Sequence, residues 1–526
     1  MSQYGSIEHH CGESQGTQGR AKAQELYATT RRNILGWYFY SFSSEPFVVS
    51  AVATYFPLLL ERFARLNGVL LHDHSKPCNS ESAKCVLPVF NERFFVDTSS
   101  FALYTFSLSV FFQAITVITV SGLVDLWSSV RVKGHVLVIF SIVGALGTIL
   151  ISQLNTNQFY ALPLMSIVTN SCYGVINVVG NSLLPEFAND LYNLSDDEMS
   201  ARTSAETGDT RTVDKLVSII SGRGASIGYF SALLVQLCTM YLVGKKQSSE
   251  DIQVAMLFVG VWWLIFQAPM AYLFRDIPRT SVSLSPFSVE TTDSNKAEKI
   301  TWRSLGYGWL SLGESFMHIT LLKDVVIFLL AWFIISDSTT SINSTAVLFS
   351  KTELNMSTMS LVLVSVITMI SAMVGSYSIP YFFSKKLNIM PDTTMLIIVI
   401  WASAIPFYGI LGFFFRGIGL KYPAEMYGVA VWYGLSLGGL AAVSRSVFSL
   451  IIPKGKESTF FSIFSITDKG SSIVGPLLIG LITDKTHQIR YAFFMLYAFL
   501  VISLPILRLL DVTRGKYEAE QLNREL

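Results

Sequence analysis

The sequence Arg-Gly-Ala-Ser-Ile at residues 223–227 returns as Lys-Gly-Ser-Ser-Ile at residues 469–473, and each copy lies inside a long apolar segment. A cation in such a segment is uncommon, because an ionised group costs several kcal/mol in hydrocarbon. Two further matches follow the same order along the chain, and they are Tyr173-Gly174 with Tyr433-Gly434 and Trp37 with Trp332. These matches indicate that the chain consists of two related halves.

The composition places this repeat in a lipid bilayer. Of 526 residues, 51% are hydrophobic and only 14% are charged, whereas soluble domains carry about 25% charged residues. The formal charge is +1, from 38 basic and 37 acidic residues. Because no large field of one sign arises from this balance, nucleic acid is not expected as a partner.

Twelve apolar segments approach or exceed the roughly 20 residues that a helix needs to cross a hydrocarbon layer of about 30 Å. We therefore predict an all-α polytopic membrane protein with about twelve transmembrane helices. The predicted spans are Trp37–Leu60, Ser99–Val124, His135–Ile151, Phe159–Leu184, Val217–Val243, Ile252–Phe274, Val325–Phe349, Ser360–Phe383, Met395–Phe415, Met426–Ile452, Thr459–Ile482 and Tyr491–Leu510.

Each repeat match pairs span n with span n+6. Such a parallel repeat is the plan of the major facilitator transporters, in which two six-helix bundles enclose a substrate site near the middle of the membrane. The predicted regions are an N-terminal tail (1–36), a first bundle (37–274), a central linker (275–324), a second bundle (325–510) and a C-terminal tail (511–526).

The distribution of Lys and Arg predicts the orientation. Residues 1–33 carry no short apolar core with a cleavage site, so the first span is expected to act as the insertion signal. The termini and even-numbered loops together hold roughly twice as many Lys and Arg residues as the odd-numbered loops. Both termini are therefore predicted to be cytosolic.

The linker contains apolar residues at helical spacing. They recur along its second half, and they are Leu305, Trp309, Leu312, Phe316 and Ile319. This spacing is typical of a helix that lies in the membrane surface. An ordinary loop with some apolar residues is an equally good interpretation.

Five segments carry a resemblance to a known family. They are Ser43-Ser44-Glu45-Pro46-Phe47, Gly122-Leu123-Val124-Asp125-Leu126-Trp127, Asn177-Val178-Val179-Gly180-Asn181-Ser182, Ser221-Gly222-Arg223-Gly224-Ala225-Ser226 and Ile466-Thr467-Asp468-Lys469-Gly470-Ser471-Ser472. These segments resemble the fungal autophagy-related protein 22 family, vacuolar amino-acid effluxers of the major facilitator superfamily. The resemblance covers nearly the whole of residues 36–511.

The resemblance implies export of leucine and other large neutral amino acids, such as isoleucine and tyrosine, from the vacuole after autophagic breakdown. It also implies a multi-pass protein of the vacuole membrane. A carrier of sugars or organic ions and a membrane scaffold that transports nothing are the alternatives. We expect neither enzymatic activity nor a cofactor. The G-x-S-x-G pattern at residues 434–438 lies inside an apolar helix, and the chain lacks the phosphate-binding loop of nucleotide-driven pumps.

A contact between the bundles is predicted at the turn between spans two and three. Major facilitator transporters typically carry Gly-x-x-x-Asp there, followed by basic residues. This chain has Ser121-Gly122-Leu123-Val124-Asp125, with Ser in place of the first Gly, and then Arg131 and Lys133. Asp125 and Arg131 are thus candidates for a cytosolic latch, and a solvated helix end is the alternative for Asp125.

Charged residues inside the spans are the candidates for the transport site. A zwitterionic amino acid needs an anion for its ammonium group and a cation for its carboxylate. Glu45 or Asp337 suits the first role, and Arg223 or Lys469 suits the second. Structural ion pairing, in particular for Asp468, is the alternative. Counted at 1.5 Å per residue, Glu45, Asp337 and Lys469 lie ~12, ~18 and ~15 Å from the cytosolic ends of their spans.

Several weaker candidates accompany these charges. Asn170, Asn177 and Asn181 share one face of span four, where they either line the path or join helices by hydrogen bonds. Arg445 lies near the cytosolic end of span ten, so we rank it last, as a residue whose charge reaches the surface.

Three features of the odd-numbered loops complete the predictions. Cys78 and Cys85 are a candidate disulfide, and Asn355 begins a glycosylation pattern close to the bilayer. His72 and His74 lack further ligands at suitable spacing, so we predict no metal site.

The predicted mechanism is alternating access, in which two bundles rock about a central site. Protonation of Glu45 or Asp337 in an acidic lumen would couple export to proton flow. Uniport without coupling is equally compatible with the sequence.

Overall fold

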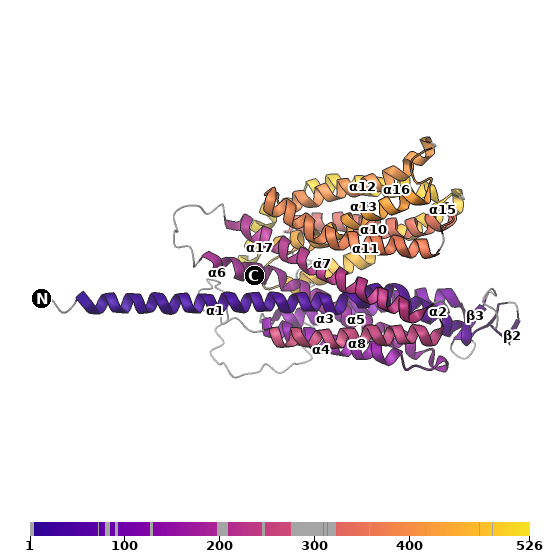
Figure 1. Ribbon diagram of the computed structural model, residues 1–526, viewed down its shortest axis with the longest axis horizontal. Coiled ribbons are helices and arrows are strands. Elements are labelled where there is room, and N and C mark those ends of the chain that lie inside the picture. The colour runs from indigo at the N-terminus through magenta and orange to yellow at the C-terminus, as the bar shows by residue number, and fades with distance from the viewer. Residues whose placement is uncertain are drawn as a thin grey trace.

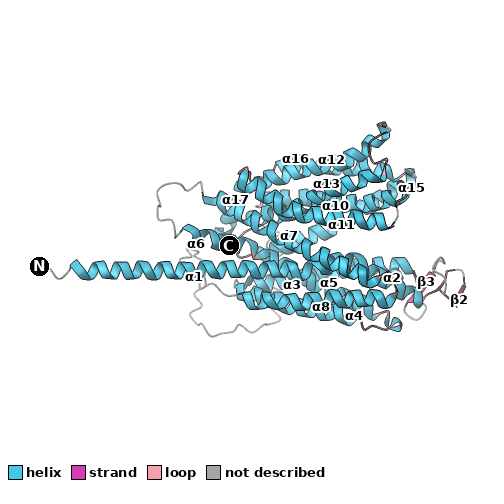
Figure 2. Ribbon diagram, in the orientation of Figure 1, coloured by secondary structure: helices cyan, strands magenta, loops and turns pink. Residues whose placement is uncertain are grey.

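The computed structural model describes residues 5–71, 73–78, 85–89, 93–126, 130–196, 209–244, 248–274, 309, 313, 322–356, 358–415, 417–472, 474–486 and 488–525. This part is almost entirely helical, and strands occur only at one end of the molecule (Figure 2). Both termini lie at the opposite end (Figure 1). We call the two ends the termini end and the sheet end.

The described residues contain eleven helices that are long and apolar enough to cross a membrane. The predicted eleventh span is not among them, because two shorter helices follow one another there. Together these two helices complete a twelfth crossing, and the fold is the predicted pair of six-helix bundles. The first bundle comprises α1 (Gly5–Pro46), η1 (Phe47–Tyr55), α2 (Phe56–Leu66), α3 (Thr98–Leu126), α4 (Val130–Ile151), α5 (Ala161–Ser182), α7 (Asp209–Val243) and α8 (Ser249–Leu273). The second comprises α10 (Lys323–Thr352), α11 (Thr358–Pro380), η3 (Tyr381–Lys386), α12 (Pro391–Phe414), α13 (Pro423–Ile451), α14 (Glu457–Ser471), α15 (Val474–Thr486) and α16 (Ala492–Arg508).

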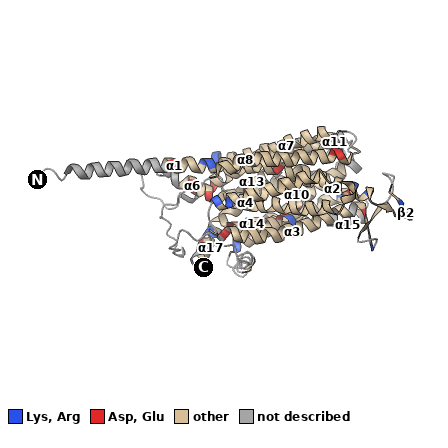
Figure 3. Cartoon of the chain, turned by 90° about the horizontal axis from the view of Figure 1, so that it is seen from below, with Lys and Arg blue, Asp and Glu red and all other residues tan. Residues whose placement is uncertain are grey.

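The outer surface matches a bilayer. Charged residues gather toward the two ends of the bundles, and the length between them is mostly uncharged (Figure 3). Large apolar side chains such as Phe111, Leu330 and Trp401 are exposed along this length. An extended surface of exposed apolar side chains on helices of this length is typical of contact with lipid.

A small antiparallel sheet at the sheet end was not predicted from the sequence. Its four strands have the order β2-β1-β3-β4, and they are β1 (Val69–Leu70), β2 (Asp73–Pro77), β3 (Cys85–Val89) and β4 (Phe94–Asp97). Cys78 and Cys85 form a disulfide, with their Cα atoms 6.0 Å apart. The disulfide ties the end of β2 to the start of β3.

Two further helices cover the termini end. α6 (Leu184–Asp196) continues from span four, and α17 (Val512–Glu525) occupies the region predicted as the C-terminal tail. α17 begins after Asp511, whose carboxylate accepts hydrogen bonds from the backbone N–H groups of Thr513 and Arg514, as an N-cap does. Most of the linker lies outside the described residues, so the predicted interfacial helix is not tested.

Span one changes its helical form in the membrane. Pro46 ends α1, and the π-helix η1 follows at once. Because proline has no N–H, it leaves the carbonyl of Phe42, four residues earlier, without its helical donor. The indole nitrogen of Trp262 donates to that carbonyl at 3.3 Å. The backbone acceptor that Pro46 frees is thus bound by a neighbouring helix.

Candidate functional site between the bundles

The bundles meet closely in the half nearer the termini, where α7 packs against α11 and α13. Gly222 permits this approach, because a Cβ there would lie 2.4 Å from the carbonyl oxygen of Ser376 on α11. Ser221, the residue before Gly222, donates to the carbonyl of Ala442 on α13 at 2.8 Å. The backbones of the two bundles are therefore in contact along α7.

Asp125 joins the bundles at the termini end. Its carboxylate accepts hydrogen bonds from the backbone N–H groups of Ser458 and Thr459 at 2.9 and 2.8 Å. The hydroxyl of Thr459 adds a third bond at 2.7 Å. These donors belong to the first turn of α14, whose own N-cap residue, Lys456, supplies no side-chain hydrogen bond. An anion from the first bundle thus caps a helix of the second.

Arg131, the other predicted latch residue, lies on the exposed side of α4. Lys133, two residues later, is buried and donates to Glu186 of α6 at 3.3 Å, within the first bundle. The structure therefore gives Asp125 a partner in the second bundle, whereas Lys133 binds within the first bundle.

Two further contacts close the termini end. Lys516 of α17 pairs with Asp214 of α7, and Lys215 donates to Asn388, which follows η3. Arg514 holds α17 on the second bundle through two hydrogen bonds to Asp324 at 2.7 and 2.8 Å. α17 is therefore anchored on one bundle and bound to the other.

One acidic and two basic side chains lie within electrostatic range of each other deeper between the bundles. Glu45 is half-buried and packs on Gly228 of α7, where a Cβ would lie 3.2 Å from its Cγ. Arg445 and Lys469, both from the second bundle, lie within electrostatic range of its carboxylate. Within the described residues, no hydrogen-bond donor contacts that carboxylate. Glu45 is therefore an anion with two cations nearby and no direct partner.

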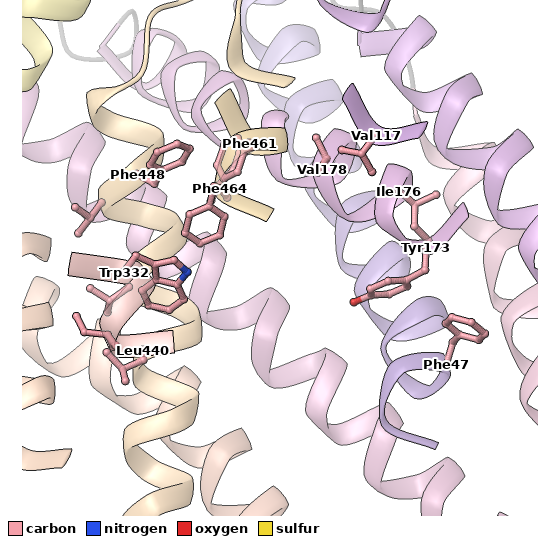
Figure 4. Close-up of a cluster of buried hydrophobic side chains, with 14 of the residues drawn as sticks. Phe47, Val117, Tyr173, Ile176, Val178, Trp332, Leu440, Phe448, Phe461 and Phe464 are labelled. Carbon is pink, nitrogen blue, oxygen red and sulfur yellow. The ribbon is translucent and has the colours of Figure 1, made fainter. Parts of the chain in front are cut away.

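Aromatic hydroxyl groups surround these charges. Tyr40 and Tyr173 lie within electrostatic range of Glu45 and Arg445, and Tyr229 of α7 is close to both and to Asp468. Figure 4 shows the Tyr173 hydroxyl from the first bundle and the Trp332 indole from the second pointing toward the region between them. The region thus combines charges with aromatic walls.

The asparagines of span four divide into two groups. Asn170 donates to Ser109 and Gln113 of α3 at 3.1 and 3.2 Å, so it joins helices within the first bundle. Asn177 donates to Tyr173, and Asn181 donates to Asn177 at 3.0 Å. This second group forms a chain of hydrogen bonds that leads toward the interface.

Arg445 contacts Asn181, the last residue of that chain. Its guanidinium donates to Asn181 at 3.4 Å across the interface and to the carbonyl of Ala441 at 2.8 Å within its own helix. The sequence ranking of Arg445 as a surface-reaching side chain missed this contact. The repeat carried the signal, because Asn181 and Arg445 lie eight and twelve residues after the matched Tyr173 and Tyr433, so they occupy related faces of spans four and ten.

The remaining acidic candidates are bound to neighbours in the second bundle. Asp468 accepts hydrogen bonds from Trp332 and Ser336 of α10 at 3.1 and 2.7 Å and lies 3.9 Å from Lys469. Asp337 is only 2% exposed and accepts a hydrogen bond from the backbone N–H of Gly475 at 2.8 Å. Asp337 therefore lies outside the cluster around Glu45.

Arg223 is exposed and lies within electrostatic range of Tyr38. Its repeat partner Lys469 lies within electrostatic range of Glu45, as Arg445 does. The structure therefore offers Arg445, together with Lys469, as the cation opposite Glu45.

The remaining candidates in the odd-numbered loops are Asn355 and the pair His72 and His74. Asn355 is exposed just beyond the end of α10 and has a positive φ of 49°, and its glycosylation stays a prediction. His72 lies outside the described residues, while His74 stacks on Phe95 with ring centroids 4.2 Å apart.

Comparisons with known proteins show what the chain as a whole is similar to. A family model described as "Vacuole effluxer Atg22 like" matches residues 29–520. Autophagy-related protein 22 of Vanderwaltozyma polyspora is 58% identical over 497 residues, which is 94% of this chain and 94% of that protein. Its counterpart in Saccharomyces cerevisiae is 58% identical over 507 residues, with 94% of each chain covered. The proton:xylose symporter XylE, a solved structure of the major facilitator superfamily, has a TM-score of 0.57 at 12% identity, covering 94% of this chain and 98% of its own.

Proposed function

The chain belongs to the Atg22-like family of vacuole effluxers, and from this premise we propose that it exports leucine and other large neutral amino acids from the vacuole to the cytosol. It is a multi-pass protein of the vacuole membrane with the major facilitator fold. The observation that carries the substrate proposal is the cluster of Glu45, Arg445 and Lys469 between the bundles.

The charges of this cluster suit a zwitterion. A charge-assisted hydrogen bond is roughly twice as strong as a neutral one, and an amino acid offers one ammonium and one carboxylate group. Glu45 would bind the ammonium group, and Arg445 with Lys469 would bind the carboxylate. Tyr40, Tyr173 and Tyr229 would contact an apolar or aromatic side chain. A sugar presents no charges to such a site, so the cluster favours an amino acid.

The contacts at the termini end support the direction of access. Asp125, Lys215 and Lys516 each join the two bundles there, while the bundles spread apart toward the sheet end (Figure 1). With the termini cytosolic, as the Lys and Arg distribution predicts, this conformation receives substrate from the lumen. Release to the cytosol then requires breaking these contacts and closing the sheet end.

Counterflow of radiolabelled leucine in proteoliposomes of the purified chain tests this proposal. We expect unlabelled leucine, isoleucine and tyrosine to compete, and xylose and organic cations not to compete. Absence of leucine counterflow, with counterflow of a sugar or an organic ion instead, would overturn the substrate assignment.

The role of Glu45 has its own test. Glu45→Gln keeps the size of the side chain but removes its charge. Because a hydrogen bond to a charged group contributes about 1.5–3 kcal/mol, the affinity for leucine should fall by roughly one to two decades. Glu61→Gln, at an exposed ion pair with Arg65, is the matched control and should leave affinity unchanged. Equal affinities for the wild type and Glu45→Gln would exclude Glu45 as the ammonium site.

Arg445→Gln separates the two ends of the substrate. It should weaken binding of leucine but spare leucinamide, which lacks the carboxylate. Equal losses for both ligands would mean that Arg445 acts only through Asn181.

A further inference from the structure

A second polar site lies within the second bundle, apart from the cluster around Glu45. It occurs where the eleventh span is interrupted, between Ser471 at the end of α14 and Val474 at the start of α15. Pro476, in the first turn of α15, has no N–H for the carbonyl of Ser472. The N–H of Gly475 donates to Asp337 of α10 instead of continuing the helix.

Asp337 and Ser341 both reach the backbone of Gly475. A Cβ on Gly475 would lie 1.9 Å from the Ser341 Oγ and 2.8 Å from the Asp337 Oδ2. The Ser341 side chain is fully buried, and its hydroxyl has no hydrogen-bond partner within the described residues. A buried hydroxyl without a partner costs about 1–3 kcal/mol. The site therefore holds unused hydrogen-bonding capacity beside a buried carboxylate.

Further unpartnered hydroxyls continue toward the sheet end. α10 and α15 run in the same direction and pack together, and Thr345 lies eight residues beyond Asp337 as Thr483 lies eight beyond Gly475. At 1.5 Å per residue, both threonines are ~12 Å nearer the sheet end, at a common level. Neither hydroxyl has a partner within the described residues. A line of buried hydroxyls thus leads from Asp337 toward the side from which substrate enters.

The charged groups on the helices around α10 are bound elsewhere or exposed. Tyr433 of α13 donates to the backbone carbonyl of Thr339. Among the charged groups, Asp468 is bound by Trp332 and Ser336, and Lys469 lies 3.9 Å from Asp468. Arg445 donates to Asn181 and Ala441, Arg490 donates to the carbonyls of Gly409, Gly419 and Leu420, and Arg514 binds Asp324. Lys485 of α15 and Arg508 of α16 are exposed. Within the described residues, no cation contacts Asp337. Its negative charge is balanced only by the N–H of Gly475.

We propose that Asp337 is a proton-carrying site, loaded from the lumen along Ser341, Thr345 and Thr483, which couples proton flow to the export described above. Loading forms an O–H bond on the Asp337 carboxylate with a proton taken from luminal hydronium, which becomes water, and no electron is transferred. A single carboxylate beside a backbone N–H donor favours a proton over a metal cation, because the donor occupies an oxygen lone pair and repels a cation. This proposal rests on the proposed function, since coupling requires a transported substrate.

The position of the site explains how loading would act on the substrate. Ionised Asp337 accepts the Gly475 N–H and fixes the start of α15, and the neutral acid is a weaker acceptor. The last turn of the preceding helix α14 contains Asp468 and Lys469, and Lys469 lies within electrostatic range of Glu45. Protonation would therefore loosen the junction between α14 and α15, next to the residues that face the substrate.

Asp337→Asn tests the proposal in proteoliposomes. Asparagine keeps an acceptor for Gly475 but cannot take up a proton. Leucine counterflow at equal pH should stay within about twofold of the wild type, because exchange needs no net proton movement. For the wild type, a pH gradient should drive accumulation by up to about tenfold per pH unit at one proton per leucine, since one pH unit is about 1.36 kcal/mol. Asp337→Asn should abolish this accumulation.

Ser341→Ala and Thr345→Val should slow the pH-driven phase while sparing counterflow. Ser344→Ala is the matched control, because Ser344 lies on the exposed side of the same helix and bonds its own backbone. If a pH gradient still drives leucine accumulation in Asp337→Asn, the proposal is overturned. Loss of leucine counterflow in a correctly inserted Asp337→Asn would also overturn it. Accumulation driven by a sodium gradient at constant pH would overturn the proton assignment. A wild type without leucine counterflow would instead contradict the proposed function.

Discussion

Spans five and eleven contain nearly the same five-residue sequence, but they differ in structure around it. α7 is continuous through Arg223-Gly224-Ala225-Ser226-Ile227, whereas the matching Lys469-Gly470-Ser471-Ser472-Ile473 lies at the interruption between α14 and α15. When the two copies are aligned, Phe230 of α7 corresponds to Pro476. A single proline thus distinguishes the interrupted span eleven from the continuous span five.

The glycines of the two copies show the same contrast. A Cβ on Gly224 would lie 2.2 Å from the ring of Trp37, which is fully buried and bonded to the carbonyl of Gly180. Gly470 has nothing within 4 Å of such a Cβ. In the second half the matching tryptophan, Trp332, donates to Asp468 instead. In the first half the motif packs closely on Trp37. In the second half it lies at the interruption between two helices, next to polar contacts.

Phe230→Pro should have the largest effect, because it would introduce into α7 the interruption that span eleven has. Proline inside a helix costs about 3 kcal/mol or more, and no described residue of the first bundle corresponds to the Asp337 cap. We expect a large loss of thermal stability in detergent and little protein at the vacuole. Pro476→Ala is the mirror variant and should remain folded. Equal destabilisation by both would show that the two spans do not differ in rigidity.

Gly224→Ala and Gly470→Ala form a matched pair with a smaller effect. Gly224→Ala should destabilise by about 1–3 kcal/mol through overpacking against Trp37. Gly470→Ala should change stability by no more than about 0.5 kcal/mol. Thermal unfolding of both purified variants measures the difference, and a Gly224→Ala variant as stable as the wild type would refute the packing role.

Asp125→Asn should destabilise less than Gly224→Ala, and it tests the start of span eleven. α14 begins under a cap from the other bundle, and loss of the charge should cost about 0.5–2 kcal/mol. The loss falls only on the conformation closed at the termini end. A cysteine introduced at Ser458 should then label faster from the cytosol in this variant than in an otherwise wild-type background. Unchanged labelling would mean that the contact does not hold the bundles together.

The sequence predicted the twelve crossings, the two bundles and the family, because the cost of burying polar backbone and charge in lipid is local and acts on each segment separately. The interface contact of Asp125 was predicted from the Gly-x-x-x-Asp pattern of major facilitator transporters, whereas its charge and its place at a helix end also fitted a solvated residue. The disulfide pair was a candidate because the two cysteines share one short loop.

The roles of the intramembrane charges depended on the tertiary structure. Glu45, Arg445 and Asp337 are equally costly residues by sequence, but which of them meet is set by helix rotation and by contacts between spans far apart in the chain. Asp337 reaches the start of α15 because α15 packs beside α10, and Arg445 meets Asn181 where the two bundles approach each other. Burial in lipid therefore fixes where the helices are, and packing between them decides which charges face one another.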